Sequence, residues 1–443
     1  MAHSIDVAKR IDEKPIGRLQ IWAILLCAVV VFSEGFDAQA IAYVAPSISA
    51  AWALDKGALG PVFGAGLLGI MLGSLLIAPL ADRFGRRPII ILSTLAFGIL
   101  TLATVFAWDL NSLLILRLLT GFGLGGAMPN AIALTSEYSP ERRRAFLVML
   151  MFGGFSLGSA GGGFFAAYLV PHYGWHAVFL FGGILPLVLI PILMWSLPES
   201  LLFLVNKGDN GPRVRALAIR LDPTIHPDAK LVTGQEASVR GRVPDLFTHG
   251  RAPITILLWL LFFMSMLDLY LVVNWLPTVL HAQGAEMGQA AIAGSIFQLG
   301  GLVGTIILGL LSDRFGRGRM LMLAYGFAAL CLTGIAYAQS GSLYLMIAIA
   351  GAGFGVVGGQ IGANALSAAF YPTRLRSTGV GWCLGVGRSG SVIGPVVGGV
   401  LLSMDMSPRH LFLLSVIPVG IAAAAAAVIQ LRYLATGRQD LTG

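Results

Sequence analysis

Long runs of apolar residues, separated by short polar stretches, dominate the chain. A helix that crosses the hydrocarbon core of a bilayer needs about 20 mostly apolar residues. Twelve segments meet this requirement, in two groups of six on either side of a polar stretch at 198–251. The predicted spans are 20–48, 58–80, 88–107, 111–135, 146–169 and 176–197, followed by 252–276, 289–311, 320–338, 342–368, 377–402 and 410–432. The pattern predicts an all-α membrane protein with twelve transmembrane helices in two six-helix pseudo-repeats.

A short motif recurs in the two halves. Residues 82–86, Asp-Arg-Phe-Gly-Arg, return unchanged as residues 313–317, an offset of 313 − 82 = 231 positions. Each copy ends an apolar segment, and a glycine stands nine residues before each aspartate. Internal repeats of this kind are typical of membrane transporters. We therefore predict an N-terminal bundle at 1–200, a cytoplasmic linker at 201–250 and a C-terminal bundle at 251–443.

Composition and charge support a membrane protein. Hydrophobic residues make up 56% of the chain and charged residues 11%, against about 45–50% and about 25% in soluble domains. The net charge of +8 does not indicate nucleic acid, because 25 of the 29 lysines and arginines fall on one predicted side of the membrane. The exceptions are Lys56 and Arg409 on the other side and Arg117 and Arg388 within spans. The positive-inside rule then places both termini in the cytoplasm, and we expect a multi-pass protein of a bacterial inner membrane.

The cysteines and histidines give no sign of metal binding or catalysis. The three cysteines, Cys27, Cys331 and Cys383, lie in apolar stretches without a pairing pattern, and the seven histidines lie in loops or at span ends. We expect no metal site and no cofactor. A membrane-embedded enzyme or a receptor remains a remote alternative.

The first predicted span contains two acids, Glu34 and Asp37, which share a helical face. Asp37 lies about 26 Å along this helix and Arg117 about 9 Å into the fourth span from the opposite side, so both reach a similar depth. Charged groups at this depth are costly and typically functional. Glu34, Asp37 and Arg117 are therefore predicted to couple transport to protons, with Asp37 and Arg117 as a switch. The alternative is a permanent ion pair that holds two helices together.

The second half contains Arg388 near the middle of its span and Asp268 in the seventh span. The planar guanidinium of Arg388 suits a substrate carboxylate, although a fixed pair with Asp268 is an alternative. Asp268 itself could be a second proton site, an arginine partner or a group that faces water. We predict that Arg388 and Asp268 belong to the substrate site together with other polar and aromatic residues at central depth. These are Asn130, Tyr270, Asn274, Gln298, Gln360, Asn364 and Trp382.

The repeated motif is expected to act in gating. An aspartate at a helix end, followed by basic residues in a tight turn, can tie neighbouring helix ends by charge-assisted bonds. Such bonds must hold in one conformation and loosen in another. The predicted gating residues are Gly73, Asp82, Arg83, Gly85, Arg86 and Glu137 in the first half and Gly304, Asp313, Arg314, Gly316 and Arg317 in the second.

These motifs resemble the major facilitator superfamily. Residues 73–87 and 304–317 are similar to its loop signature, and 117–125 is similar to its signature in the fourth span. A narrower resemblance is to the aromatic acid:proton symporter family. It rests on Glu-Gly-Phe-Asp at 34–37, Leu-Pro-Glu-Ser at 197–200, Asn-Trp-Leu-Pro at 274–277, and the glycines around Arg388 with Gly-Pro at 394–395. The first acidic position is commonly aspartate in that family and is Glu34 here.

The resemblance implies a twelve-span symporter that imports an aromatic monocarboxylate of the benzoate, hydroxybenzoate or phenylpropionate type by alternating access. The proton gradient would be the energy source, and a monomer would be the functional unit. A drug:proton antiporter of the same superfamily is the main alternative. The span-5 motif of antiporters normally contains Gly-Pro, and Ser159 stands here where that proline would be. This departure favours symport.

Overall fold

The chain, seen in a computed structural model, is almost entirely helical over the described residues, which are 4–55, 57–209, 211–226, 229–233, 242–339 and 341–435. Within these residues twelve helices are long and apolar enough to cross a membrane. In the first half they are α2 (Arg18–Ala51), α3 (Gly60–Leu76), α5 (Arg86–Thr104), α6 (Leu110–Glu137), α7 (Glu141–Tyr173) and α8 (His176–Ser196). In the second half they are α11 (Ala252–Ala282), α12 (Met287–Phe315), α13 (Arg317–Tyr337), α14 (Leu343–Phe370), α15 (Thr373–Ser403) and α16 (Pro408–Ala435). The predicted twelve-helix membrane fold is confirmed.

Most of the helices extend past the predicted apolar spans because polar residues cap or continue them outside the hydrocarbon region. Asp109 accepts a hydrogen bond from the Ser112 backbone N–H at 2.8 Å at the start of α6, and Ser342 accepts one from Leu345 at the start of α14. Such side chains satisfy backbone donors that a helix end leaves free. The second span is interrupted: after α3 the chain forms a short 3-10 turn, η1 (Ala78–Leu80), and then α4 (Ala81–Phe84).

The internal repeat is reproduced in the packing of the helices. In the first half α3 packs on α6, and in the second half α12 packs on α14. A Cβ atom at Gly73 would overlap the backbone carbonyl of Phe122, and one at Gly304 would overlap that of Phe354. Only glycine permits this close approach of two helix backbones. The two glycines that stand upstream of the repeated motif therefore hold equivalent helix pairs together.

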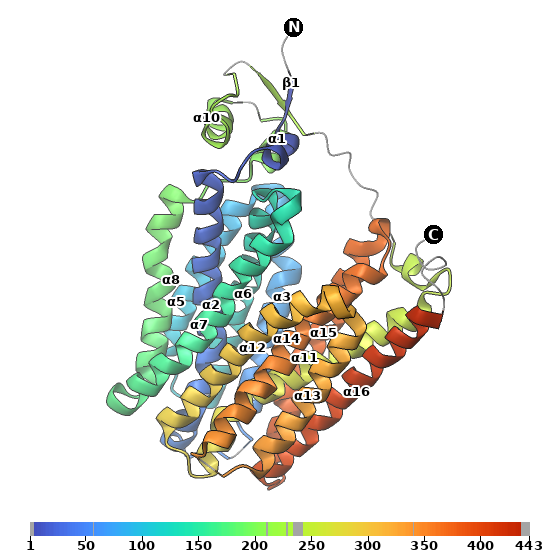
Figure 1. Ribbon diagram of the computed structural model, residues 1–443. Coiled ribbons are helices and arrows are strands. Elements are labelled where there is room, and N and C mark those ends of the chain that lie inside the picture. The colour runs from blue at the N-terminus through green and yellow to red at the C-terminus, as the bar shows by residue number, and fades with distance from the viewer. Residues whose placement is uncertain are drawn as a thin grey trace.

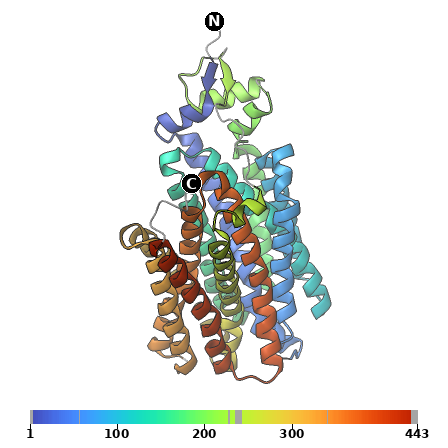
Figure 2. The ribbon, with the colours of Figure 1, turned by 90° about the vertical axis from the view of Figure 1, so that its right-hand side faces the viewer.

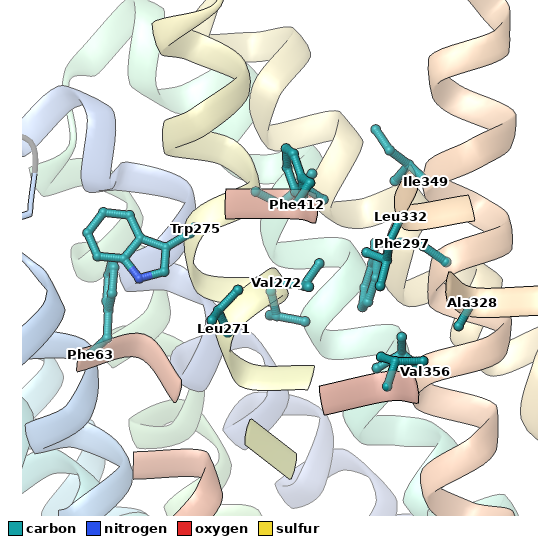
Figure 3. Close-up of a cluster of buried hydrophobic side chains, with 14 of the residues drawn as sticks. Phe63, Leu271, Val272, Trp275, Phe297, Ala328, Leu332, Ile349, Val356 and Phe412 are labelled. Atoms are coloured by element: carbon teal, nitrogen blue, oxygen red, sulfur yellow. The ribbon is translucent and has the colours of Figure 1, made fainter. Parts of the chain in front are cut away.

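The two halves touch each other over only part of their length, at one end of the helices. Figure 1 shows the six helices of each half diverging toward the side that carries the N-terminus and the linker, here called the linker side. Contacts between the halves join α7 to α12 and α3 to α15 toward the opposite, far side. There Ser295 Oγ donates to the Ala160 carbonyl at 2.6 Å. Phe63 and Trp275 meet edge to face with ring centroids 5.2 Å apart (Figure 3). The structure is therefore closed on its far side.

A small module, made of the described parts of residues 4–14 and 201–233, sits on the linker side above the first half (Figure 2). It contains α1 (Val7–Glu13), α9 (Leu201–Asn206) and α10 (Pro212–Leu221), and the strands β1 (Ser4–Asp6) and β2 (Lys230–Val232) pair in parallel within it. Val7, Ile11 and Leu231 belong to its small apolar core. The hydrophobic pattern does not predict this union of the N-terminus with the linker. A 3-10 turn, η2 (Val243–Phe247), precedes the second half.

Candidate functional site

A buried ion pair joins the first and fourth spans. Arg117 Nη1 on α6 lies 3.3 Å from Asp37 Oδ2 on α2, and both side chains are almost completely shielded from solvent. Thr101 on α5 donates its hydroxyl to Asp37 Oδ1 at 2.6 Å. Three helices of the first half thus converge on one carboxylate, and the two charges reach the common depth that the sequence predicts.

Arg117 has further partners besides Asp37. Its Nη2 atom donates to Thr104 at 2.9 Å and to Thr120 at 3.2 Å. Its guanidinium carbon lies 4.9 Å from the centre of the Phe179 ring on α8, close enough for a cation–π contact. The sequence analysis did not identify these threonines or Phe179. The only signal was spacing, because Thr101 and Thr104, and likewise Arg117 and Thr120, lie one helical turn apart.

A small cavity opens beside this ion pair, between the two halves. Its volume is about 30 Å³, and Asp37, Arg117 and Thr120 line it from the first half. Tyr270 and Asn274 line it from α11 of the second half, as the sequence predicts for a central site. A cavity needs about 10–15 Å³ of such space to hold one water molecule, so this one has room for about two water molecules and is too small for an aromatic ring. The site is contracted in this conformation and must open to admit a larger molecule.

Glu34 and Arg388 lie within electrostatic range of each other across the boundary between the halves. Glu34 is buried on α2, and its Oε1 atom has no hydrogen-bond partner among the described residues. Arg388 is half-buried on α15. Its carbonyl accepts a hydrogen bond from Ser391 at 2.7 Å, but the structure records no hydrogen bond or ion pair for its guanidinium within the described part of the chain. The charge of Arg388 acts on Glu34 across the boundary. The structure records no Arg388–Asp268 pair, because neither carboxyl oxygen of Asp268 has a hydrogen-bond partner among the described residues.

Asp268 lies inside the second half and is 0% exposed. Neither of its carboxyl oxygens has a hydrogen-bond partner among the described residues. Of the three predicted alternatives, the arginine partner and the group facing water are therefore both wrong for this conformation. Close by, Ser265 donates to Gln360 Oε1 at 2.7 Å, and Tyr325 donates to Ser265 at 2.7 Å.

The remaining predicted substrate residues do not line the small cavity. Asn130 donates to the Gly126 carbonyl at 2.8 Å and to the Ala78 carbonyl at 3.4 Å, which ties α6 to the turn after α3. Trp382 is 44% exposed and stacks on Trp259 with ring centroids 5.7 Å apart. Gln298 is buried on α12, and Asn364 is half-buried on α14 one turn after Gln360. Their place in a substrate site stays a prediction.

The first copy of the repeated motif is bound to its surroundings by charged contacts. Arg86 lies 3.2 Å from Asp82 and 3.1 Å from Glu137. Glu199, which follows α8 just before the linker, accepts hydrogen bonds from the backbone N–H groups of Arg86 at 2.9 Å and Arg87 at 3.2 Å. A carboxylate at the start of α5 is favoured by the helix dipole. All of these contacts lie within the first half and its linker.

The two copies differ in what surrounds their glycines. Gly85 and Gly316 both have positive φ, +102° and +91°, which only glycine adopts easily. A Cβ at Gly85 would overlap the Glu199 carboxylate, whereas one at Gly316 would meet nothing within 4 Å. The backbones of Arg314 and Arg317 occupy the equivalent turn, and the Asp313 side chain lies outside the described residues. The gating role of both copies stays a prediction.

Two sets of six spanning helices, with charged residues held between them and one side closed, define the class of secondary membrane transporters. A similar fold occurs in the crystal structure of a bacterial homolog of the human lysosomal transporter Spinster in an inward-facing, unoccupied conformation. That structure matches with a TM-score of 0.74 at 18% identity, over 96% of this chain and 99% of that one. At this identity the similarity concerns the fold alone.

The chain belongs to the Major Facilitator Superfamily, whose sequence pattern matches residues 27–248 and 258–440. It is 39% identical to the gallate transporter of Pseudomonas putida, over 95% of this chain and 94% of that protein. It is 40% identical to the 4-hydroxybenzoate transporter of Acinetobacter baylyi, over 97% and 95% of the two chains. The resemblance that the sequence motifs indicate is confirmed, and no enzyme family is indicated.

Proposed function

We propose that this protein imports an aromatic monocarboxylate together with protons by alternating access. The observation that carries the proposal is the separation of two charged sites. Arg388, for which no ion pair is recorded among the described residues, stands near Glu34 of the other half. A buried ion pair, Asp37–Arg117, lies beside a cavity at the boundary of the halves. One site suits an anion and the other suits a proton.

The substrate class follows from Arg388 and from the relatives. Gallate and 4-hydroxybenzoate, named for two relatives, are both ring carboxylates. A guanidinium can hold a carboxylate by two parallel hydrogen bonds. Tyr270 and Asn274 would line the same space from α11. A drug:proton antiporter for cationic compounds is disfavoured, because Arg388 would repel such cargo at the centre of the pathway.

Glu34 links substrate binding to protons. It is the charge that balances Arg388 in the empty site. A substrate carboxylate that binds Arg388 places a second negative charge beside Glu34, and like charges in a buried site disfavour each other. Uptake of a proton by Glu34 removes this conflict. Anion and proton would therefore bind together, which is the requirement for symport.

Asp37 is the proton switch of the first half. A proton on Asp37 removes the charge that attracts Arg117, while Thr104 and Thr120 still hold the guanidinium. The ion pair can thus open without leaving Arg117 wholly unpartnered. Opening of the ion pair would loosen α2 from α6 next to the cavity, which α11 of the second half also lines. This would lower the barrier for the two halves to rock against each other.

The linker side is proposed to face the cytoplasm of a bacterium, with both termini inside. The support is the excess of lysine and arginine on that side. The far-side closure then makes this structure inward-facing. No bound cofactor is needed in the proposal, since the proton gradient supplies the energy, and one chain contains both charged sites, so a monomer suffices.

The proposal is tested with purified protein in proteoliposomes and a panel of labelled benzoates, hydroxybenzoates, phenylpropionates and cinnamates. We expect concentrative uptake of at least one hydroxylated benzoate when the interior is alkaline, and only equilibration without a pH gradient. The uncharged amides of the same rings serve as a matched control and are not expected to accumulate. Uptake that ignores the pH gradient, or efflux of cationic drugs in its place, contradicts the proposal.

A further inference from the structure

Several buried polar atoms on α11 and α14 of the second half have no hydrogen-bond partner among the described residues. Besides Trp259 Nε1 and Thr278 Oγ1, they are Asp268 Oδ1 and Oδ2, Gln360 Nε2 and Asn364 Oδ1. Buried polar atoms are nearly always paired, so each exception calls for an explanation. Asp268 is the sharpest exception because its carboxyl group has neither a hydrogen bond nor any exposed surface.

A chain of hydrogen bonds runs beside this carboxyl group. The Tyr325 hydroxyl on α13 donates to Ser265 on α11, and Ser265 donates to Gln360 on α14, both at 2.7 Å. Ser265 lies three residues before Asp268, so the two side chains are neighbours on the helix surface. Tyr325 also lies within Coulombic range of Asp268. The carboxyl group therefore adjoins a chain of hydroxyls that links three helices.

The charged surroundings of Asp268 are sparse. On the helices packed against α11, the charged side chains away from helix ends are Glu34 and Asp37 on α2 and Arg388 on α15. Helix α14 carries no charged residue, and α12 and α16 carry them only in their terminal turns. The structure records no ion pair or hydrogen bond between any of these described charges and the carboxyl oxygens of Asp268. No basic residue compensates a negative charge there.

An aromatic substrate cannot reach a carboxyl group that has no exposed surface, but a proton can pass along hydroxyl groups. Asp268 is also poorly suited to a purely structural role, because a buried carboxylate without a hydrogen-bond partner lowers the stability of the fold and joins no helices. We propose that Asp268 is a second proton-binding site, located in the second half, and that the Tyr325–Ser265–Gln360 chain responds to its charge. This inference rests on the proposed proton-coupled transport.

The two charge states of Asp268 demand different hydrogen bonds. With the proton bound, the carboxyl group is neutral and the chain can keep the arrangement described above. When the proton leaves Asp268, the hydroxyl of Tyr325 turns toward the carboxylate and donates a hydrogen bond to it. Tyr325 keeps its own proton in this step. Bonds to a charged acceptor are roughly twice as strong as neutral ones. Ser265 then loses the hydrogen bond from Tyr325, and the hydrogen bonds that join α11, α13 and α14 are rearranged.

This change would reach the transport site through α11 itself. Tyr270 and Asn274, which line the cavity, lie on α11 within two turns of Asp268. A shift of α11 relative to α13 and α14 therefore moves two cavity walls. Buried acids that respond to protons would then occur in both halves of the protein, Glu34 and Asp37 in the first and Asp268 in the second.

The first test is infrared difference spectroscopy of the purified full-length protein in lipid, recorded as the pH is raised. We expect a carboxylic-acid C=O band that persists in Asp37→Asn and Glu34→Gln but is lost in Asp268→Asn. Tyr325→Phe should shift the frequency of this band without removing it, because it takes away the nearby hydroxyl alone. The absence of any band that depends on Asp268, in a protein that is folded, overturns the inference.

The second test measures protons carried per substrate, from the pH gradient that just balances a substrate gradient in proteoliposomes. Asp268→Asn should carry one proton fewer than wild type, whereas Asp268→Glu and the exposed control Asp55→Asn should keep the wild-type ratio. An unchanged ratio in Asp268→Asn overturns the inference. If wild type shows no coupling, the proposed function fails, and the infrared band still decides whether Asp268 binds a proton. If Asp268→Asn does not fold, the infrared band of Tyr325→Phe decides whether Asp268 binds a proton. A band with an unchanged frequency in Tyr325→Phe overturns the inference.

Discussion

Asp37 and Arg117 form a buried ion pair of 3.3 Å beside the cavity between the two halves, and Arg117 keeps two threonine partners that do not depend on Asp37. This arrangement differs from a simple clamp between helices. A buried pair that loses one member usually leaves an uncompensated charge, at a cost of about 3–5 kcal/mol. Here Thr104, Thr120 and the Phe179 ring still contact Arg117 when Asp37 is neutral, and these contacts reduce the cost. The ion pair can therefore open and close within a transport cycle.

Replacing Arg388 by lysine should weaken substrate binding while leaving the protein folded. Lysine keeps the charge but loses the planar fork that matches a carboxylate. Hydrogen bonds to charged groups contribute about 1.5–3 kcal/mol, so the KM for an aromatic acid should rise about tenfold to a hundredfold. Initial uptake rates over a range of substrate concentrations measure this change.

The matched control for Arg388→Lys is Arg319→Lys at an exposed position on α13. It should leave KM unchanged. A normal KM in Arg388→Lys, at normal protein level, would remove Arg388 from the substrate site.

The far-side contact between α7 and α12 should be sensitive to a side chain at Gly163. A Cβ there would lie 2.6 Å from the Ala291 carbonyl and would also overlap Ser295. Gly163→Val should therefore push the halves apart and disfavour the closed far side. At Gly161, two residues away, a Cβ meets only the Phe32 ring at 3.7 Å, so Gly161→Val is the control.

Labelling of a single cysteine reports this change. Ser47 on α2 contacts Met287 on α12 in the closed far side, and Ser47→Cys can be introduced after the native cysteines are replaced. A membrane-impermeant maleimide should label it several-fold faster in Gly163→Val than in Gly161→Val. Equal labelling in the two variants speaks against this account of far-side closure.

The two glycines of the repeated motif should differ in their tolerance of alanine. Both have positive φ, so Gly85→Ala and Gly316→Ala each introduce backbone strain of about 1–3 kcal/mol. Gly85→Ala also drives a methyl group into the Glu199 carboxylate. Thermal unfolding in detergent should show the larger loss of stability for Gly85→Ala. Equal losses would mean that the Glu199 contact contributes nothing.

The module on the linker side should loosen in acid. Burial alone would raise the pKa of Asp222, but its hydrogen bonds with Thr224 and the charges of Lys14 and Arg10 outweigh this and lower it. A carboxyl group with a lowered folded pKa stabilises the fold above its unfolded pKa of about 3.9, and this contribution is lost as the pH falls through the folded value. Hydrogen exchange of α1, corrected for intrinsic rates, should therefore speed up below about pH 4.

Asp222→Asn should already expose α1 at neutral pH and should show little further change in acid. Asp55→Asn, far from the module, should behave like wild type. If hydrogen exchange of α1 still speeds up in acid in Asp222→Asn, a group other than Asp222 causes the acid response.

The arrangement of twelve helices could be predicted because a bilayer imposes a strict rule. Every span must bury its backbone polar groups in a helix of about 20 apolar residues, and this leaves a strong pattern in the sequence. The depth of Asp37 and of Arg117 could be predicted for the same reason, since a helix rises by a fixed amount per residue. These features depend on local sequence and on the membrane alone.

The partners of the charged residues could not be predicted in the same way. Threonine in a helix often bonds to its own backbone, so nothing in the sequence marked Thr101, Thr104 or Thr120. The nearness of Arg388 to Glu34 depends on how the two halves face each other. The strands β1 and β2 contain three residues each and pair Ser4 with Lys230 across 230 − 4 = 226 positions, which is too short and too distant to leave a pattern.

The most direct test of the account is the effect of Asp37→Asn on transport in proteoliposomes. Asparagine keeps the size of the side chain but cannot cycle between charged and neutral forms. We predict that accumulation of labelled 4-hydroxybenzoate driven by a pH gradient is abolished, while exchange of internal for external substrate without a gradient continues. The exposed Asp55→Asn should retain both activities. Full concentrative uptake by Asp37→Asn would contradict the central claim that Asp37 couples protons to transport.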